Sequence, residues 1–187
     1  MEIFDIVNEK DEVIGSADRD KCHSDPGLIH RTAHFTLIDK KKKKILLTQR
    51  SFKLKTDPGK LCFAGEHLYA GENYVQGVIR GVQEELGFTP KIFKEVCHRI
   101  IKFPNQTEFA RFFVVEWSRE KIDYDKEEII DIKWLDPETL ARGSHNYSEI
   151  AEYWVKNSDW FKILDENIAH LPGVLASHLP MKNFFCK

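Results

Sequence analysis

A group of charged residues on one expected helix carries the strongest chemical signal in the sequence. Arg80, Glu84 and Glu85 project from one side of the segment 72–88, and Gly87 is positioned to end the helix as its C-cap. The other side carries an apolar stripe at helical spacing, formed by Val75, Val78, Ile79, Val82 and Leu86. Carboxylates beside an arginine suit a magnesium ion and a diphosphate, although a solvated helix with one i,i+4 Arg–Glu pair would show part of this pattern.

The segment from Gly65 to Phe88 resembles the Nudix box, the loop–helix–loop signature of the Nudix hydrolases. The family pattern is glycine, five residues, glutamate, seven residues, then Arg-Glu-apolar-any-Glu-Glu-any-Gly-apolar. The chain matches it at Glu72, Arg80, Val82, Glu84, Glu85, Gly87 and Phe88. The resemblance implies one α/β domain over residues 1–187, an α/β/α sandwich around a mixed β-sheet, in which Glu72 and Gly87 have structural roles.

Two positions depart from the box. Glu66 stands where the pattern has its first glycine, and Gly81 stands where it has a glutamate that is commonly a metal ligand in the family. Magnesium keeps several waters and needs few protein carboxylates, so Glu84 and Glu85 could still hold one ion. Gly77 and Gly81 each cost roughly 1 kcal/mol relative to alanine inside a helix, which indicates a close approach, a functional need or simple drift.

A narrower resemblance, from about Ile3 to Leu140, is to the branch of the superfamily that contains isopentenyl-diphosphate isomerase. In those isomerases three histidines and strand glutamates hold a metal. The matching positions here are His23, His30, His67 and Glu108, with Gln106 at the second glutamate position. Such donors suit manganese, zinc or iron better than magnesium. Each histidine also has an ordinary interpretation, such as orienting a loop or lying exposed at the surface.

The isomerase chemistry also needs a cysteine two residues before the third histidine, and that position is Gly65. Cys62 lies nearby in an expected strand, where a buried structural thiol is the preferred interpretation. Isomerisation is therefore the second hypothesis.

Further residues are expected around a diphosphate substrate. Arg50 ends an expected strand and could bind a phosphate bidentately, with Lys60 and Glu66 assigned to the same substrate site. A basic loop that balances neighbouring acids is the alternative. Three carboxylates could accept a proton from the attacking water: Glu108, Glu127 and Glu128.

Composition fits a single enzyme domain. The chain has 187 residues, 42% of them hydrophobic and 31% charged, with a formal net charge of -2 that favours neither nucleic acid nor acidic membranes. Four scattered cysteines favour a reducing compartment, and no apolar run reaches membrane-spanning length. The start lacks a secretion signal, so we expect a cytoplasmic protein. Five lysines at 40–44 read as a solvated turn.

Strands and helices alternate along the chain without a linker. An N-terminal hairpin (1–20) is expected from two strands over 2–7 and 13–17. Further strands are expected over 34–38, 45–50, 92–103 and 108–116, and an acidic turn with a strand over 126–135. The C-terminal helices that follow include a long helical pattern over 147–168. Asp136 and Pro137 should begin a helix, and Trp154 and Trp160 should pack in the segment 147–187. The hairpin and the apolar tail could each pair with a second copy, giving a homodimer.

We therefore expect a Mg2+-dependent hydrolase, with Mn2+ as an alternative ion, that cleaves a diphosphate linkage in a nucleoside diphosphate derivative or a similar small organic diphosphate. The alternatives are an isopentenyl-diphosphate isomerase with a His/Glu metal site, and a nucleotide-binding protein in which Gly81 marks a lost activity.

Overall fold

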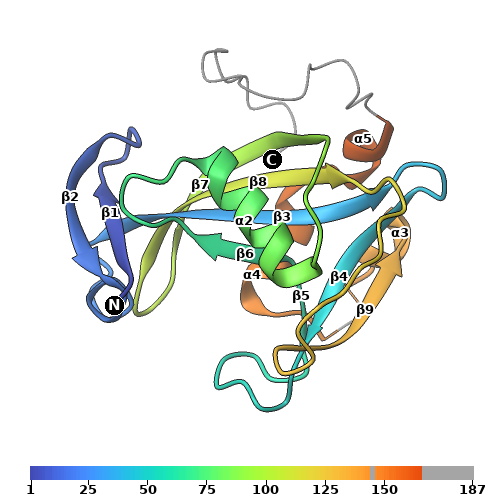
Figure 1. Cartoon of the computed structure of the whole chain (residues 1–187), viewed down its shortest axis with the longest axis horizontal. Coiled ribbons are helices and arrows are strands. Elements are labelled where there is room, and N and C mark those ends of the chain that lie inside the picture. The colour runs from blue at the N-terminus through green and yellow to red at the C-terminus, as the bar shows by residue number, and fades with distance from the viewer. Residues whose placement is uncertain (144–145, 166–187) are drawn as a thin grey trace.

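A computed structural model of the chain describes residues 1–143 and 146–165, in which nine strands form one mixed sheet (Figure 1). The strands are β1 Ile3–Val7, β2 Val13–Asp18, β3 Ile29–Asp39, β4 Lys44–Arg50, β5 Leu61–Cys62, β6 Ala64–His67, β7 Phe93–Lys102, β8 Thr107–Glu116 and β9 Ile129–Leu135. The helices are α1 Arg19–Cys22, α2 Tyr74–Leu86, α3 Pro137–Ala141, α4 Glu149–Asn157 and α5 Trp160–Asp165.

The central strand β3 makes the sheet mixed and also makes it fork. It runs parallel to β8 along its length and antiparallel to β1, β4 and β6. Its pairing with β4 is limited to Ile38 and Asp39, and from Phe35 back to Thr32 its partner is β6 instead. Strand β4 continues with β5 on one side and β9 on the other. The sheet therefore opens between β5 and β6.

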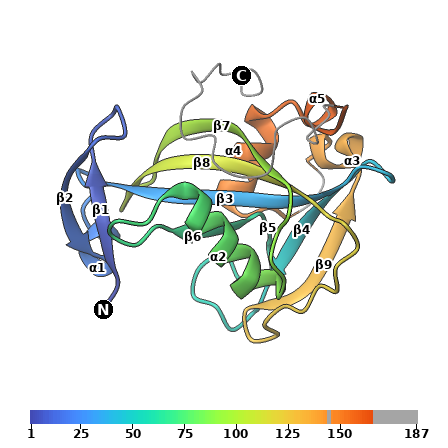
Figure 2. The ribbon, with the colours of Figure 1, turned by 45° about the horizontal axis from the view of Figure 1, so that its top comes forward.

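Helices cover both faces of the sheet, which confirms the predicted α/β/α sandwich. Figure 2 shows α2 in front of the sheet and α4 and α5 behind it. Because side chains alternate along a strand, Ala33, Phe35 and Leu37 pack under α2. The opposite core gathers the aromatic rings of Phe112, Trp154 and Trp160, as well as apolar side chains of β4 and β8. The two tryptophans are packing residues, as predicted.

The box helix α2 approaches the sheet through its two glycines. A Cβ at Gly77 would lie 3.0 Å from Leu68 Cδ1, and a Cβ at Gly81 would lie closer still to its neighbours. Close approach is therefore the reason for these glycines. The buried stripe of α2 includes Val78 and Val82 as predicted, whereas Val75 and Ile79 are only half-buried.

The N-terminal hairpin β1–β2 is confirmed and joins the sheet through the Ile6–His30 pair. Strand β3 begins at Ile29, earlier than the predicted residue 34, because its pairing with β8 continues to that end. The predicted helix 147–168 is wrong as one element, since Ser158 is extended at φ −119° and ψ 144° and separates α4 from α5. The predicted apolar tail, residues 166–187, lies outside the described residues.

Helix α3 begins with Asp136 as its N-cap and Pro137 in its first turn, as predicted. Residues 40–43 of the lysine run form the turn between β3 and β4, with 41–43 exposed, whereas Lys44 is the first residue of β4. Within the described ranges, no helix has both the length and the apolar character needed to cross a membrane.

Candidate functional site

The box helix α2 ends at Gly87, as the sequence predicts, and it begins with a capping box. The Asn73 side chain accepts a bond from the backbone N–H of Gln76, and the Gln76 side chain accepts one from the backbone N–H of Asn73. This reciprocal capping box satisfies two backbone donors of the first turn. At the other end Gly87 adopts the left-handed conformation, with φ 78° and ψ 16°, and its N–H donates to the carbonyl of Gln83.

Arg80 connects the helix to the loop that precedes it. Its Nε and Nη2 donate to the two oxygens of Glu72, each at 3.0 Å. Its Nη1 donates to Glu66 Oε2 at 2.7 Å and to Glu84 Oε2 at 3.2 Å, and Nη2 also donates to the carbonyl of His67 at 2.8 Å. Bidentate guanidinium–carboxylate pairs are geometrically specific. Arg80 therefore fixes the positions of three carboxylates.

A cavity of about 140 Å³ lies at the fork of the sheet. Residues from both layers line it, among them His34, Arg50, Cys62, Gly65, Glu85, Glu128 and Ile150. Arg50 lies at the end of β4, where its Nε donates to the carbonyl of Thr56 at 3.0 Å. Lys60 is absent from the lining and instead pairs with Asp57 at 2.6 Å. Of the two basic residues predicted to bind the substrate, Arg50 therefore lines the cavity and Lys60 does not.

Glu85 is a half-buried carboxylate with little to neutralise it. Burial raises its pKa, and the negative charges of Glu66 and Glu128 raise it further, to about 8, with only the Arg50 charge acting against them. Among the described residues, no group donates a hydrogen bond to it, whereas Glu84 is exposed and bonded to Arg80. The buried charge of Glu85 would therefore be stabilised by a bound cation.

The two glutamates of the acidic turn lie in different surroundings. Glu128 lines the cavity. Glu127 is exposed, and its carboxylate pairs with Lys53 Nζ at 2.6 Å. The sequence predicts either of these two glutamates as a proton acceptor, and of the two only Glu128 lines the cavity.

Glu108 is buried, and both of its oxygens are engaged. Oε2 accepts a bond from Thr32 Oγ1 and lies 3.0 Å from His34 Nε2, while Oε1 accepts from Gln106 Nε2 at 3.1 Å. Burial alone would raise the pKa of Glu108, but the hydrogen bond with His34 opposes that effect, and the pKa lies below its ordinary value. Glu108 therefore orients His34, and it does not line the cavity.

His34 is the residue that sequence reasoning missed. It is 7% exposed, its Nδ1 has no partner among the described residues, and its ring lines the cavity. The alternation of polar Thr32, His34 and Thr36 with apolar Ala33, Phe35 and Leu37 in one strand could have revealed it. A Cβ at Gly65 would lie 2.7 Å from His34 Nδ1, so this histidine occupies the space beside the glycine.

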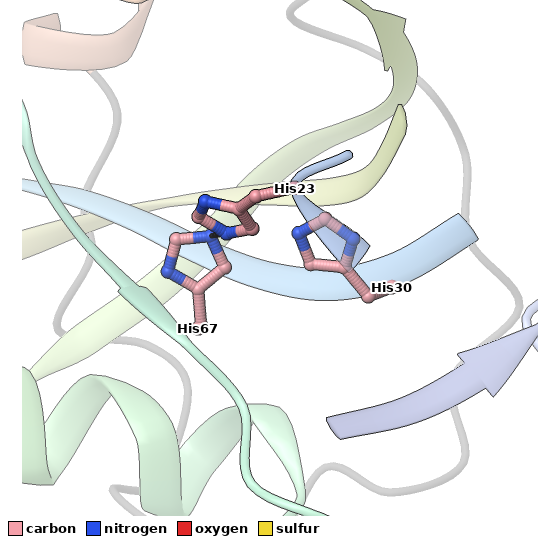
Figure 3. A group of neighbouring side chains, drawn as sticks. All are labelled: His23, His30 and His67. Atoms are coloured by element: carbon pink, nitrogen blue, oxygen red, sulfur yellow. Dashed lines mark hydrogen bonds between the residues drawn. The ribbon is translucent and has the colours of Figure 1, made fainter. Parts of the chain in front are cut away.

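The three predicted histidines do meet, on the hairpin side of the sheet (Figure 3). His23 caps α1, His30 lies in β3 and His67 ends β6, and one ring nitrogen from each lies within 4.8 Å of the others. The Nε2 atoms of His23 and His67 are 3.1 Å apart, and the ring of Phe4 stacks on His67 at 5.1 Å. His23 is half-buried, contrary to the exposed position that the sequence favoured.

These imidazoles are in the form that binds metals. Burial lowers the pKa of His30 to about 4 and that of His67 to about 3, so both rings are neutral at pH 7. His30 is fully buried, and within the described part of the chain its ring nitrogens have no side-chain hydrogen-bond partner, while an interaction with the Leu28 backbone opposes only part of the burial effect on its pKa. Neutral imidazoles with free lone pairs are ligands for manganese, zinc and iron.

Cys62 has the character of a structural thiol. Its Sγ donates to the carbonyl of Phe63 at 2.9 Å and accepts a bond from Ser148 Oγ at 3.1 Å. Burial raises the pKa of this thiol to about 11, so the reactive thiolate is scarce at neutral pH.

The fold and the box agree with the result of a family comparison. The NUDIX domain model matches residues 28–156, which is more than half of the chain. The chain therefore belongs to the Nudix family.

The relatives include both isomerases and hydrolases. An isopentenyl-diphosphate Delta-isomerase of Streptomyces avermitilis is 28% identical over 148 residues, covering 74% of this chain and 73% of that protein. An uncharacterized Nudix hydrolase of Yersinia pestis is 31% identical over 145 residues, covering 75% of this chain and 76% of that protein.

Solved structures share the fold at lower identity. DR0079 from Deinococcus radiodurans has a TM-score of 0.69 and 22% identity, and the match covers 83% of this chain and 98% of that chain. A MutT protein from Methanosarcina mazei has a TM-score of 0.61 and 20% identity, with 75% and 94% covered.

Proposed function

We propose that this protein is a magnesium-dependent hydrolase that cleaves the diphosphate linkage of a nucleoside diphosphate derivative or a similar small organic diphosphate. The observation that carries the proposal is the cavity at the fork of the sheet. It gathers Glu85 from the box helix, Glu128 from the acidic turn and Arg50 from β4 around one space. Two carboxylates and a guanidinium there match the charges of a cation–diphosphate complex.

The donors present fit a hard divalent cation. Glu85 has no hydrogen-bond donor within the described residues, and its pKa is raised by burial and by the charges of Glu66 and Glu128. Carboxylate oxygens are the ligands that Mg2+ and Mn2+ prefer. When bound, such an ion would neutralise the diphosphate and lower the pKa of the attacking water.

The chain's own side chains would bind and orient the substrate. Glu84 and Glu85 would hold the cation, and the bond from Arg80 Nη1 keeps Glu84 in place. Arg50 uses its Nε for the loop carbonyl, which leaves its terminal nitrogens to bind a substrate phosphate. Glu128 accepts the proton of the attacking water as general base.

The three-histidine cluster supports a second candidate, isopentenyl-diphosphate isomerisation, because His23, His30 and His67 meet where the isomerase resemblance requires a metal. Two observations weigh against it. Gly65 occupies the position of the isomerase cysteine, and His34 Nδ1 lies 2.7 Å from where a Cβ there would be. Cys62, which lines the same cavity as Gly65, has its pKa raised to about 11 by burial. A protein that binds nucleotide without turnover is the third candidate.

The test is incubation of the purified protein with Mg2+ and a panel of diphosphates, followed by mass spectrometry and phosphorus NMR. The panel includes nucleotide sugars, ADP-ribose, dinucleotides, nucleoside triphosphates and isopentenyl diphosphate. We expect cleavage of at least one member and its loss in Glu85→Gln. Appearance of the allylic isomer without loss of phosphate would replace hydrolysis by isomerisation. No change in any compound would leave binding as the function.

A further inference from the structure

Two departures from the family box lie next to each other in space. Glu66 replaces the first glycine of the pattern, and Gly81 replaces its glutamate. Strand β6 pairs with β3 so that Glu66 is opposite Ala33, which is a core residue under α2. The side chain of Glu66 therefore points toward the box helix, at the turn that carries Gly81.

The two departures depend on each other sterically. A Cβ built on Gly81 would lie 2.4 Å from Glu66 Cγ and 2.7 Å from Phe35 Cε1. Phe35 is fully buried, so it cannot yield freely. The side chain of Glu66 thus fills the space that a glutamate at position 81 would need.

The carboxylate of Glu66 also reaches the charged groups of the box. Its Oε2 lies 2.7 Å from Arg80 Nη1, and the same nitrogen lies 3.2 Å from Glu84 Oε2. Because Glu66 and Glu84 share one nitrogen of Arg80, the single positive charge of Arg80 does not neutralise both carboxylates. Glu66 is also the charged neighbour with the largest effect on Glu85, whose pKa it raises.

The cavity that Glu85 lines has a further unsatisfied group, although Glu66 and Glu84 lie outside its lining. His34 is 7% exposed, its Nδ1 has no partner among the described residues, and its ring lines the same cavity as Glu85. A buried polar atom without a partner is costly unless a ligand or water completes it. The cavity therefore has the properties of a site that receives a ligand.

We propose that Glu66 supplies, from strand β6, the metal-binding carboxylate that the box helix lacks at Gly81. The inference rests on the proposed divalent-cation site and adds a third carboxylate to Glu84 and Glu85. By this account Gly81 does not mark a lost activity, because the ligand has moved from the helix to the strand that packs against it.

Mn2+ binding, followed by electron paramagnetic resonance and by calorimetry without substrate, tests the proposal independently of turnover. Glu66→Gln keeps the shape and an acceptor for Arg80 but removes the charge, and we expect at least about tenfold weaker binding. Glu72→Gln is the matched control, because Glu72 contacts Arg80 but is not a proposed ligand. It should bind Mn2+ within about threefold of the unaltered protein.

A rescue experiment separates ligation from general damage to the site. Glu66→Gly combined with Phe35→Leu clears the space around position 81, and this double variant should bind Mn2+ weakly. Adding Gly81→Glu should restore the affinity by about tenfold, because the carboxylate returns to the helix.

Unchanged Mn2+ affinity in Glu66→Gln would overturn the proposal, as would an equal loss in Glu72→Gln. If Glu66→Gln does not fold, Glu66→Asp decides in the same way, because its shortened carboxylate should bind more weakly. Absence of hydrolysis with Mn2+ binding that depends on Glu66 would refute the proposed function alone. Hydrolysis together with an Mn2+ affinity that does not change when Glu66 is substituted would refute this inference alone.

Discussion

Replacing Glu85 with glutamine should stabilise the metal-free protein at alkaline pH while it removes cation binding. Burial and the charges of Glu66 and Glu128 raise the pKa of Glu85 from 4.5 to about 8. The folded state therefore holds this proton more tightly than the unfolded state does. The free energy of unfolding therefore falls as pH rises from 4.5 to about 8. Above that pH the ionised Glu85 carboxylate destabilises the folded state by its full amount.

The size of the effect follows from the pKa. A change from 4.5 to about 8 corresponds to at most about 5 kcal/mol, at about 1.4 kcal/mol for each pKa unit. Glu85 is half-buried, so water screens part of its charge, and we expect about 2 kcal/mol. For a domain of this size, that gain raises Tm by about 4–8 °C.

The assay is thermal and urea unfolding at pH 4.5 and pH 8.5 in the presence of EDTA. Glu85→Gln should match the unaltered protein at the lower pH and exceed it at the higher pH. The exposed Glu84 provides a graded comparison, because its negative charge is one of those that raise the pKa of Glu85, so its replacement by glutamine should give a smaller gain at the higher pH than Glu85→Gln does. With Mg2+ in place of EDTA, only the unaltered protein should gain stability. A pH-independent gain, or a loss at pH 8.5, would show that the charged form of Glu85 does not destabilise the fold.

Three further substitutions test separate parts of the structure. Gly65→Cys should lower the free energy of unfolding by about 1–3 kcal/mol in urea, because its Cβ meets His34 Nδ1 at 2.7 Å, and NMR should detect no isomerase activity. Gly87→Ala should lower the free energy of unfolding more than Gly71→Ala does. Both glycines have positive φ, but a Cβ at Gly87 would also lie 2.6 Å from the backbone oxygen of Asp123, whereas nothing lies within 4 Å at Gly71. Equal losses of stability in calorimetry would contradict this. His30→Ala should abolish the rise in Tm caused by Zn2+, and a persistent rise would exclude the histidine cluster as its site.

The sequence predicted the elements well where local signals are strong. Asn73 and Gly87 bound the box helix because caps depend on a few adjacent residues. The break between α4 and α5 had a similar signal, since Asp159 accepts a bond from the backbone N–H of Lys162 as an N-cap would. The helical pattern that the sequence shows over 147–168 concealed it.

The parts of the site that the sequence could not predict depend on packing between distant segments. The meeting of Glu66 with Gly81 requires the register of β6 against β3 and the approach of α2, and neither is encoded locally. The choice between Glu127 and Glu128 depends on the path of a loop, in which Lys53 pairs with the first of them. The three histidines were predicted from a family resemblance, and their convergence depends on the pairing of β3 with β6.

The fork in the sheet allows binding selectivity and chemistry to evolve separately. Glu85 enters the cavity from the α2 layer, whereas Ile150 enters it from α4, on the opposite face. Substitutions along the cavity side of α4 would reshape the wall for a leaving group without moving the carboxylates. A library confined to that helix is therefore a direct route to altered substrate selectivity.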